Sequence, residues 1–328
     1  MLSAVKPSNV LTLGNYIGAI KNWVTMQKDY DCIFFAVDLH TITKRIEGQM
    51  LRDQTYYVIA AYIAAGLDPE KVTLFTQSHV PAHTELSWIM TCFCQMGELN
   101  RMTQYKDLAA KAGASIGAGI FNYPTLMASD ILLYQTHLVP VGEDQKQHVE
   151  LTRDIAIRMN GIYGDDLFRV PEPWIPKVGA RIMDLQDPTA KMGKSDSQGG
   201  GAVYLSDSDK EIEKKVKRAT TDSGTEITDD DAKPGIKNLL TIQSAITGKP
   251  ISELVASYSG RQYGHLKVET AEIVVQAVKP IREKTDALLK DRTYLDEILK
   301  KGADKAASRA ERTLAKVYDR VGFIPKKT

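Results

Sequence analysis

Cysteine is scarce in this sequence of 328 residues, and its placement excludes several kinds of site. There are 3 cysteines, Cys32, Cys92 and Cys94, and no second group follows that could complete a zinc or iron–sulfur centre. So few cysteines also argue against a disulfide framework. Cys92 and Cys94 stand in an apolar stretch, which predicts buried, reduced thiols. We therefore expect neither a structural metal nor an iron–sulfur cluster.

Long apolar runs are missing as well. No stretch approaches the roughly 20 residues that span a bilayer, and the amino terminus lacks the basic-then-apolar pattern of a signal peptide. We therefore expect a cytoplasmic protein without a membrane partner.

A large net charge is absent too, because 42 Lys and Arg residues face 41 Asp and Glu residues. This balance excludes a histone-like polycation, so any site for a polyanion must be local. Residues 281–328 hold a mild local excess, with 13 Lys and Arg against 8 Asp and Glu. The hydrophobic content of 43% can form a substantial core, and the length favours two domains.

The first half of the chain alternates short β-rich runs with helical patterns. Residues 32–37 and 72–77 are compact runs of β-branched and aromatic residues, and each is followed by a helical pattern. Residues 50–65 place an apolar stripe on one helical face, and residues 143–164 form a second helix candidate. Because this alternation is typical of βαβ units, we predict an α/β nucleotide-binding architecture with a parallel sheet.

The composition changes further along the chain. Residues 187–202 are rich in Pro, Gly, Ser, Lys and Asp, which predicts a mobile loop with a function. After residue 205 the pattern is almost wholly helical, so we predict a helical second domain.

Two clusters of polar residues follow the first predicted elements. Thr12-Leu-Gly-Asn15 opens an amphipathic helix over 16–26, where a glycine lets a nucleotide approach the backbone and unpaired N–H groups can meet phosphate. An ordinary helix cap is the alternative. His40 stands just after the strand over 32–37, where open α/β sheets bind ligands, although a structural hydrogen bond explains it equally well.

A third cluster places one carboxylate in a largely apolar stripe. Tyr123, Met127, Asp130 and Tyr134 share a helical face at their spacing. A buried carboxylate needs a hydrogen-bond donor. Pairing with Arg, Lys or backbone and binding of a ligand N–H or O–H are equal alternatives at this point.

The fourth cluster is Lys191-Met-Gly-Lys-Ser195, within the predicted loop. Two lysines three residues apart beside a hydroxyl suit a triphosphate, because the loop can close onto the charge as it develops. The segment is not a P-loop, since that motif requires glycine where Pro188 stands. A solvated basic loop is the alternative.

Taken together and in this order, the clusters resemble the class I aminoacyl-tRNA synthetases. Thr12-Leu-Gly-Asn15 stands in place of their first signature, His-x-Gly-His, and residues 191–195 in place of the second, Lys-Met-Ser-Lys-Ser. The runs 127–134, 139–154 and 179–183 closely resemble bacterial-type tryptophanyl-tRNA synthetases, and the likeness covers nearly the whole chain.

The resemblance implies an α/β fold: a Rossmann-like parallel-sheet catalytic domain over 1–205, with a helical insertion at about 105–180 and the signature loop at 187–202, and an all-helical anticodon-binding domain over 206–328. The implied reaction joins L-tryptophan to ATP, releases pyrophosphate, and transfers the tryptophanyl group to the 3′-terminal adenosine of tRNA(Trp). Mg²⁺ is expected to accompany ATP rather than to occupy a protein cage. Members of the family are homodimers, so a homodimer is expected.

For the amino acid, the resemblance implies one polar contact deep in the pocket, an apolar wall and two contacts to the α-amino group. These roles fall to Asp130 for the indole N–H, to Met127, Val139 and Val141 for the wall, and to Tyr123 and Gln145 for the amino group.

For ATP, the resemblance implies contacts from both signatures and from the segments between them. The residues are Lys6, Thr12, Gly14, Asn15 and His40 facing ATP; Asp144 at the ribose; Gly142, Ile182 and Met192 at the adenine; and Lys191, Lys194 and Ser195 at the departing pyrophosphate. Among them, the expected catalytic residues are Thr12, Asn15, His40, Lys191, Lys194 and Ser195.

Three positions depart from the family pattern. Lys6 replaces a neutral amide, Leu108 stands where a cation is expected near the triphosphate, and Gly193 replaces a serine. Our hypothesis is that Lys6 partly substitutes for the missing cation, with Lys111 as the rival. Gly193 leaves both signature lysines in place, so we expect altered loop closure rather than inactivity.

Three other functions compete with this one. A tyrosyl-tRNA synthetase shares the architecture, and residues 142–148 together with the surroundings of Asp130 favour tryptophan. A catalytically weak relative that binds tryptophan or RNA for regulation is a second alternative. A dinucleotide-dependent oxidoreductase is disfavoured, because no Gly-x-Gly-x-x-Gly follows a strand and opens a helix.

Overall fold

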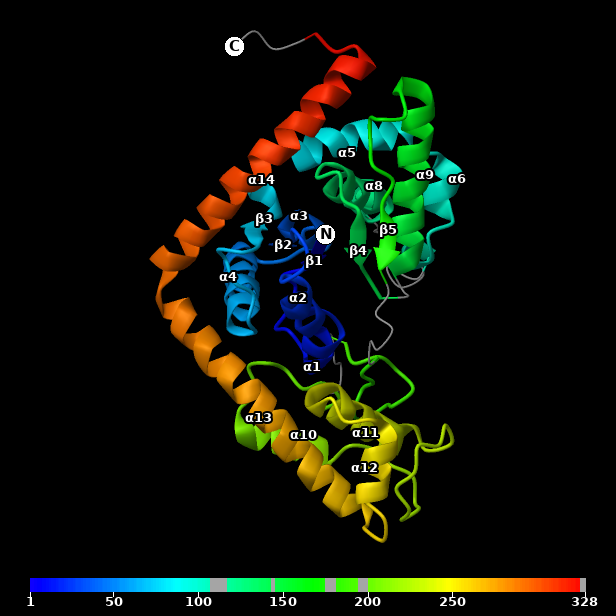
Figure 1. Ribbon diagram of the computed structural model, residues 1–328, viewed down its shortest axis with the longest axis vertical. Helices are drawn as coiled ribbons and strands as arrows, with labels where there is room; N and C mark the ends of the chain where they lie inside the picture. Colours follow the sequence, from blue (N-terminus) through cyan, green and yellow to red (C-terminus); the bar gives the residue numbers. More distant parts are fainter. Residues whose placement is uncertain (107–116, 143–144, 175–180, 194–199, 325–328) are drawn as a thin grey trace.

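The structure is a computed structural model that describes residues 1–106, 117–142, 145–174, 181–193 and 200–324 (Figure 1). The amino-terminal elements are β1 (Leu2–Val5), α1 (Leu13–Asn15), the π-helical turn η1 (Tyr16–Ile20), α2 (Lys21–Met26), β2 (Ile33–Ala36), α3 (Asp38–Thr41), α4 (Gly48–Ala64), β3 (Thr73–Thr76), the 3₁₀ turn η2 (Gln77–His79), α5 (Ala82–Phe93) and α6 (Met96–Asn100). The later elements are α8 (Ala118–Leu132), β4 (Leu138–Pro140), α9 (Lys146–Tyr163), β5 (Glu172–Trp174), α10 (Asp209–Lys217), α11 (Pro234–Thr247), α12 (Ile251–Ser257), α13 (Tyr263–Lys290) and α14 (Arg292–Val321).

Two small parallel sheets lie side by side and form the centre of the amino-terminal part. Strands β1, β2 and β3 pair in that order, and β4 pairs with β5. β4 lies next to β1, where the Ser3 hydroxyl donates to the carbonyl of Pro140 at 3.2 Å. The order in space is therefore β3-β2-β1-β4-β5, which is that of doubly wound α/β proteins. The predicted α/β fold with a parallel sheet is confirmed.

The β-rich runs and helical stripes of the sequence mark these elements closely. The predicted strands over 32–37 and 72–77 contain β2 and β3, whose residues are all buried, as expected for parallel strands covered on both faces. The stripe over 50–65 lies on α4. One prediction was too simple, because the helix expected over 16–26 begins with the π-helical turn η1 and is α-helical only in α2.

Alternate side chains of β2 enter two separate apolar layers. Phe34 stacks on Trp23 with ring centroids 4.8 Å apart, and Trp23 in turn meets the ring edge of Tyr62 from α4. Phe35 points to the other face and stacks on Phe75 at 4.8 Å. Because successive strand residues face opposite sides, the sheet holds both layers together.

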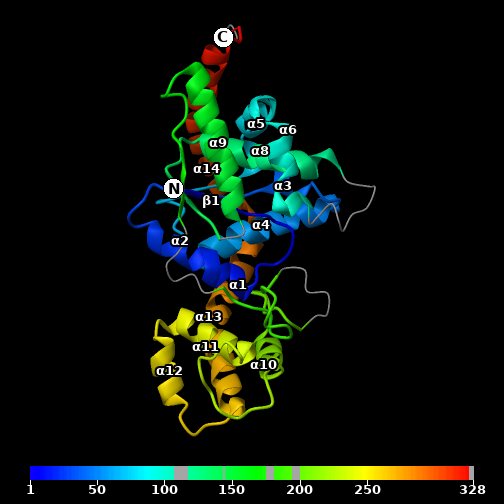
Figure 2. The same ribbon diagram turned by 90° about the vertical axis from the view of Figure 1, so that its right-hand side faces the viewer.

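The last two helices connect the two ends of the molecule. Figure 1 shows α13 and α14 as a long arm along one side, and Figure 2 shows α10, α11 and α12 grouped at one end, away from the sheets. α13 packs on α10 and α11 and then on α4, while α14 packs on β3 and α5. The chain after residue 205 is helical as predicted, but its final helix lies against the sheet-bearing part. The domain boundary at 205 and 206 stays a prediction.

Gly302 allows α14 to lie directly on the outer edge of the sheet. A Cβ atom at this position would overlap the carbonyl oxygen of Leu74, in the middle of β3. Only glycine therefore fits at this contact. Since β3 is the last strand of its sheet, α14 covers an edge that would otherwise expose unpaired backbone groups.

The cysteine prediction was wrong in one respect. Cys32 is buried and Cys94 is half-buried, but Cys92 is exposed, one turn from Trp88 on the outer face of α5. The apolar stretch around them therefore does not belong wholly to the core: Ile89 and Met90 point inward and Trp88 points outward. Among the described residues, no helix has both the length and the apolar content needed to cross a membrane.

Candidate active site

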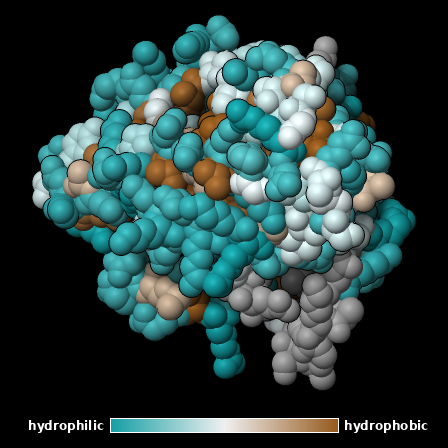
Figure 3. Space-filling view, turned by 90° about the horizontal axis from the view of Figure 1, so that it is seen from below, coloured by the Kyte–Doolittle hydropathy of each residue, from teal (hydrophilic) through white to brown (hydrophobic). Residues whose placement is uncertain are grey.

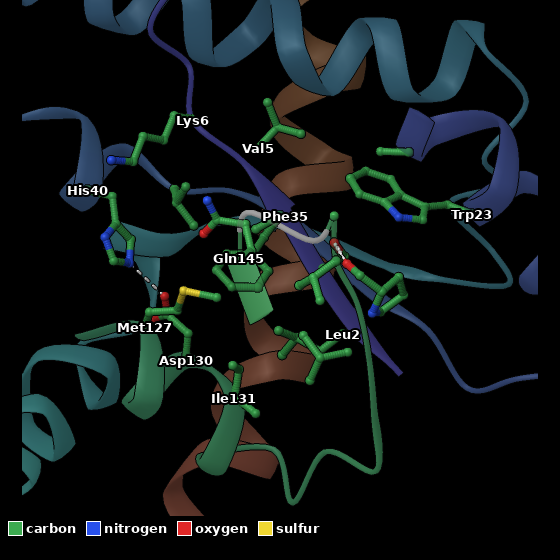
Figure 4. Close-up of a pocket in the computed structure, with 18 of the residues that line it drawn as sticks. Leu2, Val5, Lys6, Trp23, Phe35, His40, Met127, Asp130, Ile131 and Gln145 are labelled. Carbon is green, nitrogen blue, oxygen red and sulfur yellow. Dashed lines mark hydrogen bonds and ion pairs between the residues drawn. The ribbon is translucent and has the colours of Figure 1, made fainter. Parts of the chain in front are cut away.

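A cavity of about 410 Å³ opens where the two sheets meet. Its walls include β1 and the residues that follow β4, so it lies at the point where the strand order reverses, which is where open α/β sheets bind ligands. Figure 4 shows Leu2 and Val5 of β1 on its wall, with Trp23 on one side and His40 and the ammonium group of Lys6 on the other.

All six residues expected to bind tryptophan line this one cavity. They come from α8, from β4 and the residue after it, and from the start of α9: Tyr123, Met127, Asp130, Val139, Val141 and Gln145. The helical spacing of the first three and the position of the valines at β4 bring them together. Their contacts with an amino acid remain a prediction.

Asp130 is buried at the bottom of the cavity and accepts three hydrogen bonds. His40 Nε2 donates to Oδ2 at 2.9 Å, which Figure 4 marks with a dashed line. His83 Nδ1 and Gln77 Nε2 donate to Oδ1 at 2.6 and 2.7 Å. The sequence left two kinds of partner open for Asp130, namely Arg, Lys or backbone groups and a ligand N–H or O–H. The partners in the structure are of neither kind, because they are imidazole and amide side chains.

These donors keep Asp130 ionised inside the protein. Burial by itself would raise the pKa of the carboxyl group, but the hydrogen bonds from His40 and His83 outweigh it, so that the pKa lies below its usual value. A carboxylate has about four lone-pair sites, and donors among the described residues occupy three of them. The remaining one is on Oδ2, the oxygen with a single donor.

A second residue layer holds one of the donors in place. The Tyr134 hydroxyl forms a hydrogen bond with His83 Nε2 at 2.8 Å, which holds the imidazole ring with its Nδ1 toward Asp130. The sequence patterns did not assign His83 or Gln77 to the site. Both follow β3, as His40 follows β2, and the shared carboxyl edge of parallel strands is the signal that could have found them.

His40 lies on the amino-acid side of the site. The resemblance assigned it to ATP, whereas the structure places its ring, 4% exposed, between Asp130 and the edge of the Tyr123 ring. Its Nδ1 is buried without a hydrogen-bond partner among the described residues. A contact between His40 and ATP therefore stays a prediction, while its contact with Asp130 is a feature of the structure.

Lys6 brings a positive charge to the mouth of the cavity. Its Nζ lies over the Tyr123 ring, 5.2 Å from the centroid. Burial of the ammonium group, and then the like charge of Lys44, lower the pKa of Lys6. The Tyr123 hydroxyl accepts from His148 Nε2 at 2.7 Å and donates to Gln104 at 3.0 Å, which fixes its ring beneath the lysine. Burial raises the pKa of Tyr123 to about 12, so it remains a phenol.

The two signature segments lie next to each other. Gly14 faces Met192, because a Cβ on Gly14 would lie 3.5 Å from the Met192 Cβ. Met192 N donates to the carbonyl of Ile182 at 3.0 Å, so three residues expected at ATP converge from distant parts of the sequence. Thr12 and Asn15 bond reciprocally, with Asn15 N donating to Thr12 Oγ1 at 3.2 Å and Thr12 N donating to Asn15 Oδ1 at 3.0 Å. The helix cap that was the alternative explanation for Thr12–Asn15 is therefore present.

The remaining expected ATP residues are distributed as follows. Gly142 lines the amino-acid cavity. Lys191, next to Met192, is exposed and forms an isolated antiparallel β-bridge with Met183. Asp144, Lys194 and Ser195 lie outside the described residues, as do Leu108 and Lys111, so the idea that Lys6 compensates for a missing cation stays a prediction.

Comparison with known proteins gives a consistent result over the whole chain. The family model described as tRNA synthetases class I (W and Y) matches residues 1–279. The tryptophan–tRNA ligase of Clostridium perfringens is 52% identical over 326 residues, which cover 99% of this chain and 98% of that protein. The crystal structure of tryptophanyl-tRNA synthetase from Mycoplasma pneumoniae matches with a TM-score of 0.91 and 35% identity, over 98% of this chain and 97% of that one. The Campylobacter jejuni enzyme complexed with ADP and tryptophan matches with a TM-score of 0.83 and 36% identity, over 98% and 99%.

Proposed function

This chain belongs to the class I tRNA synthetases for tryptophan and tyrosine, and we propose that it is a tryptophan–tRNA ligase. It activates L-tryptophan with ATP to tryptophanyl-adenylate and pyrophosphate, and it then transfers the tryptophanyl group to the 3′-terminal adenosine of tRNA(Trp). The identity to a curated tryptophan–tRNA ligase along the full chain supports this substrate.

The observation that carries the choice of amino acid is the remaining lone pair of Asp130. A carboxylate held ionised by His40 and His83 accepts an indole N–H in a cavity that is otherwise largely apolar. Phenylalanine has no donor and would leave this lone pair unpaired, a class of penalty that reaches about 10⁴- to 10⁵-fold in other sites. Tyrosine carries its donor on a smaller ring, which leaves the cavity unfilled.

Activation of the amino acid needs alignment more than acid–base chemistry. The tryptophan carboxylate is already a nucleophile, so the barrier falls when it is held in line with the α-phosphate and the phosphate charge is neutralised. We assign the neutralisation to Lys6 at the mouth of the cavity and to Lys191 with Lys194 in the second signature. The Gly14 backbone, next to Met192 and Ile182, is the surface that ATP approaches.

We also propose that Mg²⁺ enters the site bound to ATP. Magnesium in such sites is held mainly by phosphate oxygens and water, and it supplies charge neutralisation of the triphosphate. Within the part of the chain that is described, no group of three or more His, Cys, Asp or Glu side chains is placed to hold a metal. The protein groups that neutralise the phosphates are the lysines named above.

The functional unit that we propose is a homodimer. Trp88 on α5, Met96 on α6 and Ile157 on α9 are 70%, 66% and 54% exposed. These neighbouring helices lie together at the end of the molecule remote from α10–α12 (Figure 1), and Arg158 of α9 binds Glu98 of α6 at 2.5 Å. Large exposed apolar side chains on rigidly joined helices indicate a protein interface, and a second copy of the chain is the partner proposed.

The helical end is the part proposed to approach the anticodon. Its surface is mainly hydrophilic in Figure 3, which views the molecule from below the α10–α12 end. In the basic run over 214–218, Lys214, Lys217 and Arg218 are exposed, with Lys217 paired to Glu213. The half-buried Lys215 pairs with Asp207. A cytoplasmic location, where tRNA and ATP meet, belongs to the same proposal.

The test is ATP–pyrophosphate exchange with tryptophan, tyrosine and phenylalanine supplied separately, followed by charging of tRNA(Trp). We expect exchange with tryptophan, little exchange with the other two, and formation of tryptophanyl-tRNA. Exchange that depends on tyrosine would replace the proposal with the tyrosine branch of the family. Tight binding of tryptophan without charging would favour the regulatory relative.

A further inference from the structure

A second cleft opens beside the amino-acid cavity. It measures about 490 Å³, and we call it the basic cleft. The segment between α3 and α4 forms the largest continuous part of its wall, and the start of α8 lies across from it. Its lining is Lys6, Ser8, His40, Thr41, Thr43, Lys44, Arg45, Ile46, Glu47, Met50, Gln104, Ile120 and Tyr123.

The basic cleft and the amino-acid cavity are continuous. Lys6, His40, Gln104 and Tyr123 line both of them. A molecule bound in the cleft would therefore meet the amino-acid cavity at Lys6 and Tyr123, close to Gln145. Tyr123 and Gln145 are the two residues expected at the α-amino group. Because the carboxyl group of an amino acid is bonded to the same carbon as the α-amino group, the reacting carboxyl group would lie at this same end of the cavity.

The cleft lies apart from the two signature segments, although it shares Lys6 and His40 with the residues expected to face ATP. Its lining contains none of Thr12, Gly14 and Asn15, and none of the described residues 182–193 that meet them. The activated amino acid would therefore have the nucleotide part of the adenylate on one side, at the signature segments. The basic cleft would give a second substrate access from the other side. Any second substrate must enter by a route that the adenylate does not fill.

The charges in the cleft favour an anion. Lys44 and Arg45 are exposed and form no ion pair with the residues that the structure describes. Lys44 lies near enough to Lys6 to lower the pKa of Lys6 through repulsion, in addition to the effect of burial. The acid of the cleft, Glu47, is engaged at the amino end of α4, where it accepts from Gln49 N at 2.9 Å and Met50 N at 2.7 Å.

Apolar side chains and a hydroxyl complete the lining. Met50 is 52% exposed and faces the cleft together with Ile46 and the nearly buried Ile120. The Thr43 hydroxyl donates to the carbonyl of His40 at 2.8 Å and keeps its oxygen available as an acceptor. Cations beside an apolar surface suit a single-stranded nucleotide chain, whose phosphates meet the cations while a base or ribose packs on the apolar side.

We infer that the basic cleft receives the 3′ end of the tRNA, with Lys44 and Arg45 on its phosphodiester groups and the terminal ribose reaching the amino-acid cavity past Lys6 and Tyr123. This inference rests on the proposed function and deepens it. In the transfer step, the ribose hydroxyl oxygen forms an ester bond with the carboxyl carbon, and the bond from that carbon to the phosphate oxygen breaks. AMP departs with the electron pair, and the hydroxyl proton passes to the departing phosphate.

The experiment separates the two half-reactions in the full-length protein. The double variant Lys44→Gln/Arg45→Gln is compared with Lys28→Gln/Lys71→Gln, which removes two exposed lysines near the opposite, amino-terminal ends of the strands. Tryptophan-dependent pyrophosphate exchange is measured first, and then single-turnover transfer from preformed tryptophanyl-adenylate to tRNA. We expect unchanged exchange in both variants and transfer reduced by roughly tenfold or more in the first one alone.

A second arm locates the contact on the tRNA. Dissociation constants are measured for intact tRNA and for tRNA without its three 3′-terminal nucleotides. The Lys44→Gln/Arg45→Gln variant should bind intact tRNA more weakly than the unchanged protein does, and this difference should vanish with the shortened tRNA. An equal loss with both tRNAs, unchanged transfer, or a parallel loss of exchange would each overturn the inference. Absence of exchange in the unchanged protein would instead overturn the proposed function.

Discussion

Asp130 and His83 form the tightest contact of the amino-acid cavity, with 2.6 Å between Oδ1 and Nδ1 in a fully buried setting. His40 approaches the other carboxylate oxygen, so two imidazoles that follow neighbouring strands of the sheet fix one carboxylate. This arrangement decides both the charge and the orientation of the group that faces the amino acid.

Replacing Asp130 with asparagine should weaken the selection of tryptophan. The amide nitrogen of Asp130→Asn would face His40 or His83, which are donors themselves, and the charged acceptor for the indole N–H would be lost. We expect kcat/KM for tryptophan in pyrophosphate exchange to fall by about 10- to 100-fold, with a smaller change for phenylalanine. Asp154→Asn, an exposed acid on α9, is the control. An unchanged ratio of tryptophan to phenylalanine would remove Asp130 from the specificity site.

The stability that Asp130 contributes should depend on pH in a definite direction. Its pKa in the folded protein lies below the value in the unfolded chain, which is about 3.9. The contribution is therefore complete above that value and decreases as the pH falls toward the lowered folded pKa. The difference in free energy of unfolding between the unchanged protein and Asp130→Asn, measured by urea denaturation from pH 7 to 3, should shrink below about pH 4. A difference that stays constant would contradict this.

Tyr134→Phe should disturb tryptophan binding from outside the cavity. The change removes the hydroxyl that orients His83, so Asp130 loses a fixed donor without losing its charge. We expect a severalfold increase in KM for tryptophan, little change in kcat, and a loss of about 1–3 kcal/mol in stability. Tyr318→Phe removes a comparable hydroxyl bond, to Glu85 at 2.7 Å, and should destabilise without changing KM. Equal KM values for the two variants would show that Tyr134 is only structural.

Two glycines in helices should respond in opposite ways to alanine. Gly302→Ala would force α14 away from Leu74 and should destabilise the protein by about 1–3 kcal/mol or more. Gly161 lies within α9 with open space around its Cα, so Gly161→Ala should stabilise by roughly 0.5–1 kcal/mol. Thermal unfolding checks both. A neutral Gly302→Ala would show that α14 can shift without cost.

The proposed dimer predicts a clear effect of one exposed tryptophan. Trp88→Glu places a charge in the apolar surface of α5 and should convert a dimer into a monomer in sedimentation velocity. Ile324→Glu changes a side chain that is 93% exposed at the carboxyl end, and it should leave the mass unchanged. A monomeric unchanged protein, or a dimer that survives Trp88→Glu, would place the interface elsewhere or remove it.

The sequence predicted the parts of this molecule that local pattern controls. The buried strands β2 and β3, the stripe on α4 and the residues that line the amino-acid cavity follow from periodicity, from position at the carboxyl ends of strands, and from the family resemblance. Spacing on α8 placed Met127 and Asp130 on one face without knowledge of the sheet.

Contacts between distant segments could not be predicted in the same way. The donors to Asp130 come from residues 40, 77 and 83, and nothing local to Asp130 indicates them. The exposure of Cys92 was not predicted because an apolar stretch has the same composition whether it faces the core or the outside. The packing of α14 on β3 brings together residues more than 200 positions apart. Gly302 is the local feature of the sequence that permits this contact.

The placement of α14 sets a lower limit on the piece of this protein that can work alone. A fragment ending near residue 205 would contain both signatures and the amino-acid cavity, yet it would leave the outer strand of its sheet bare. That strand leads directly into Gln77, which holds Asp130. Removing α14 would therefore disturb the position of Asp130, although the two are far apart in the sequence. We expect that a minimal catalytic version of this enzyme has to retain α14.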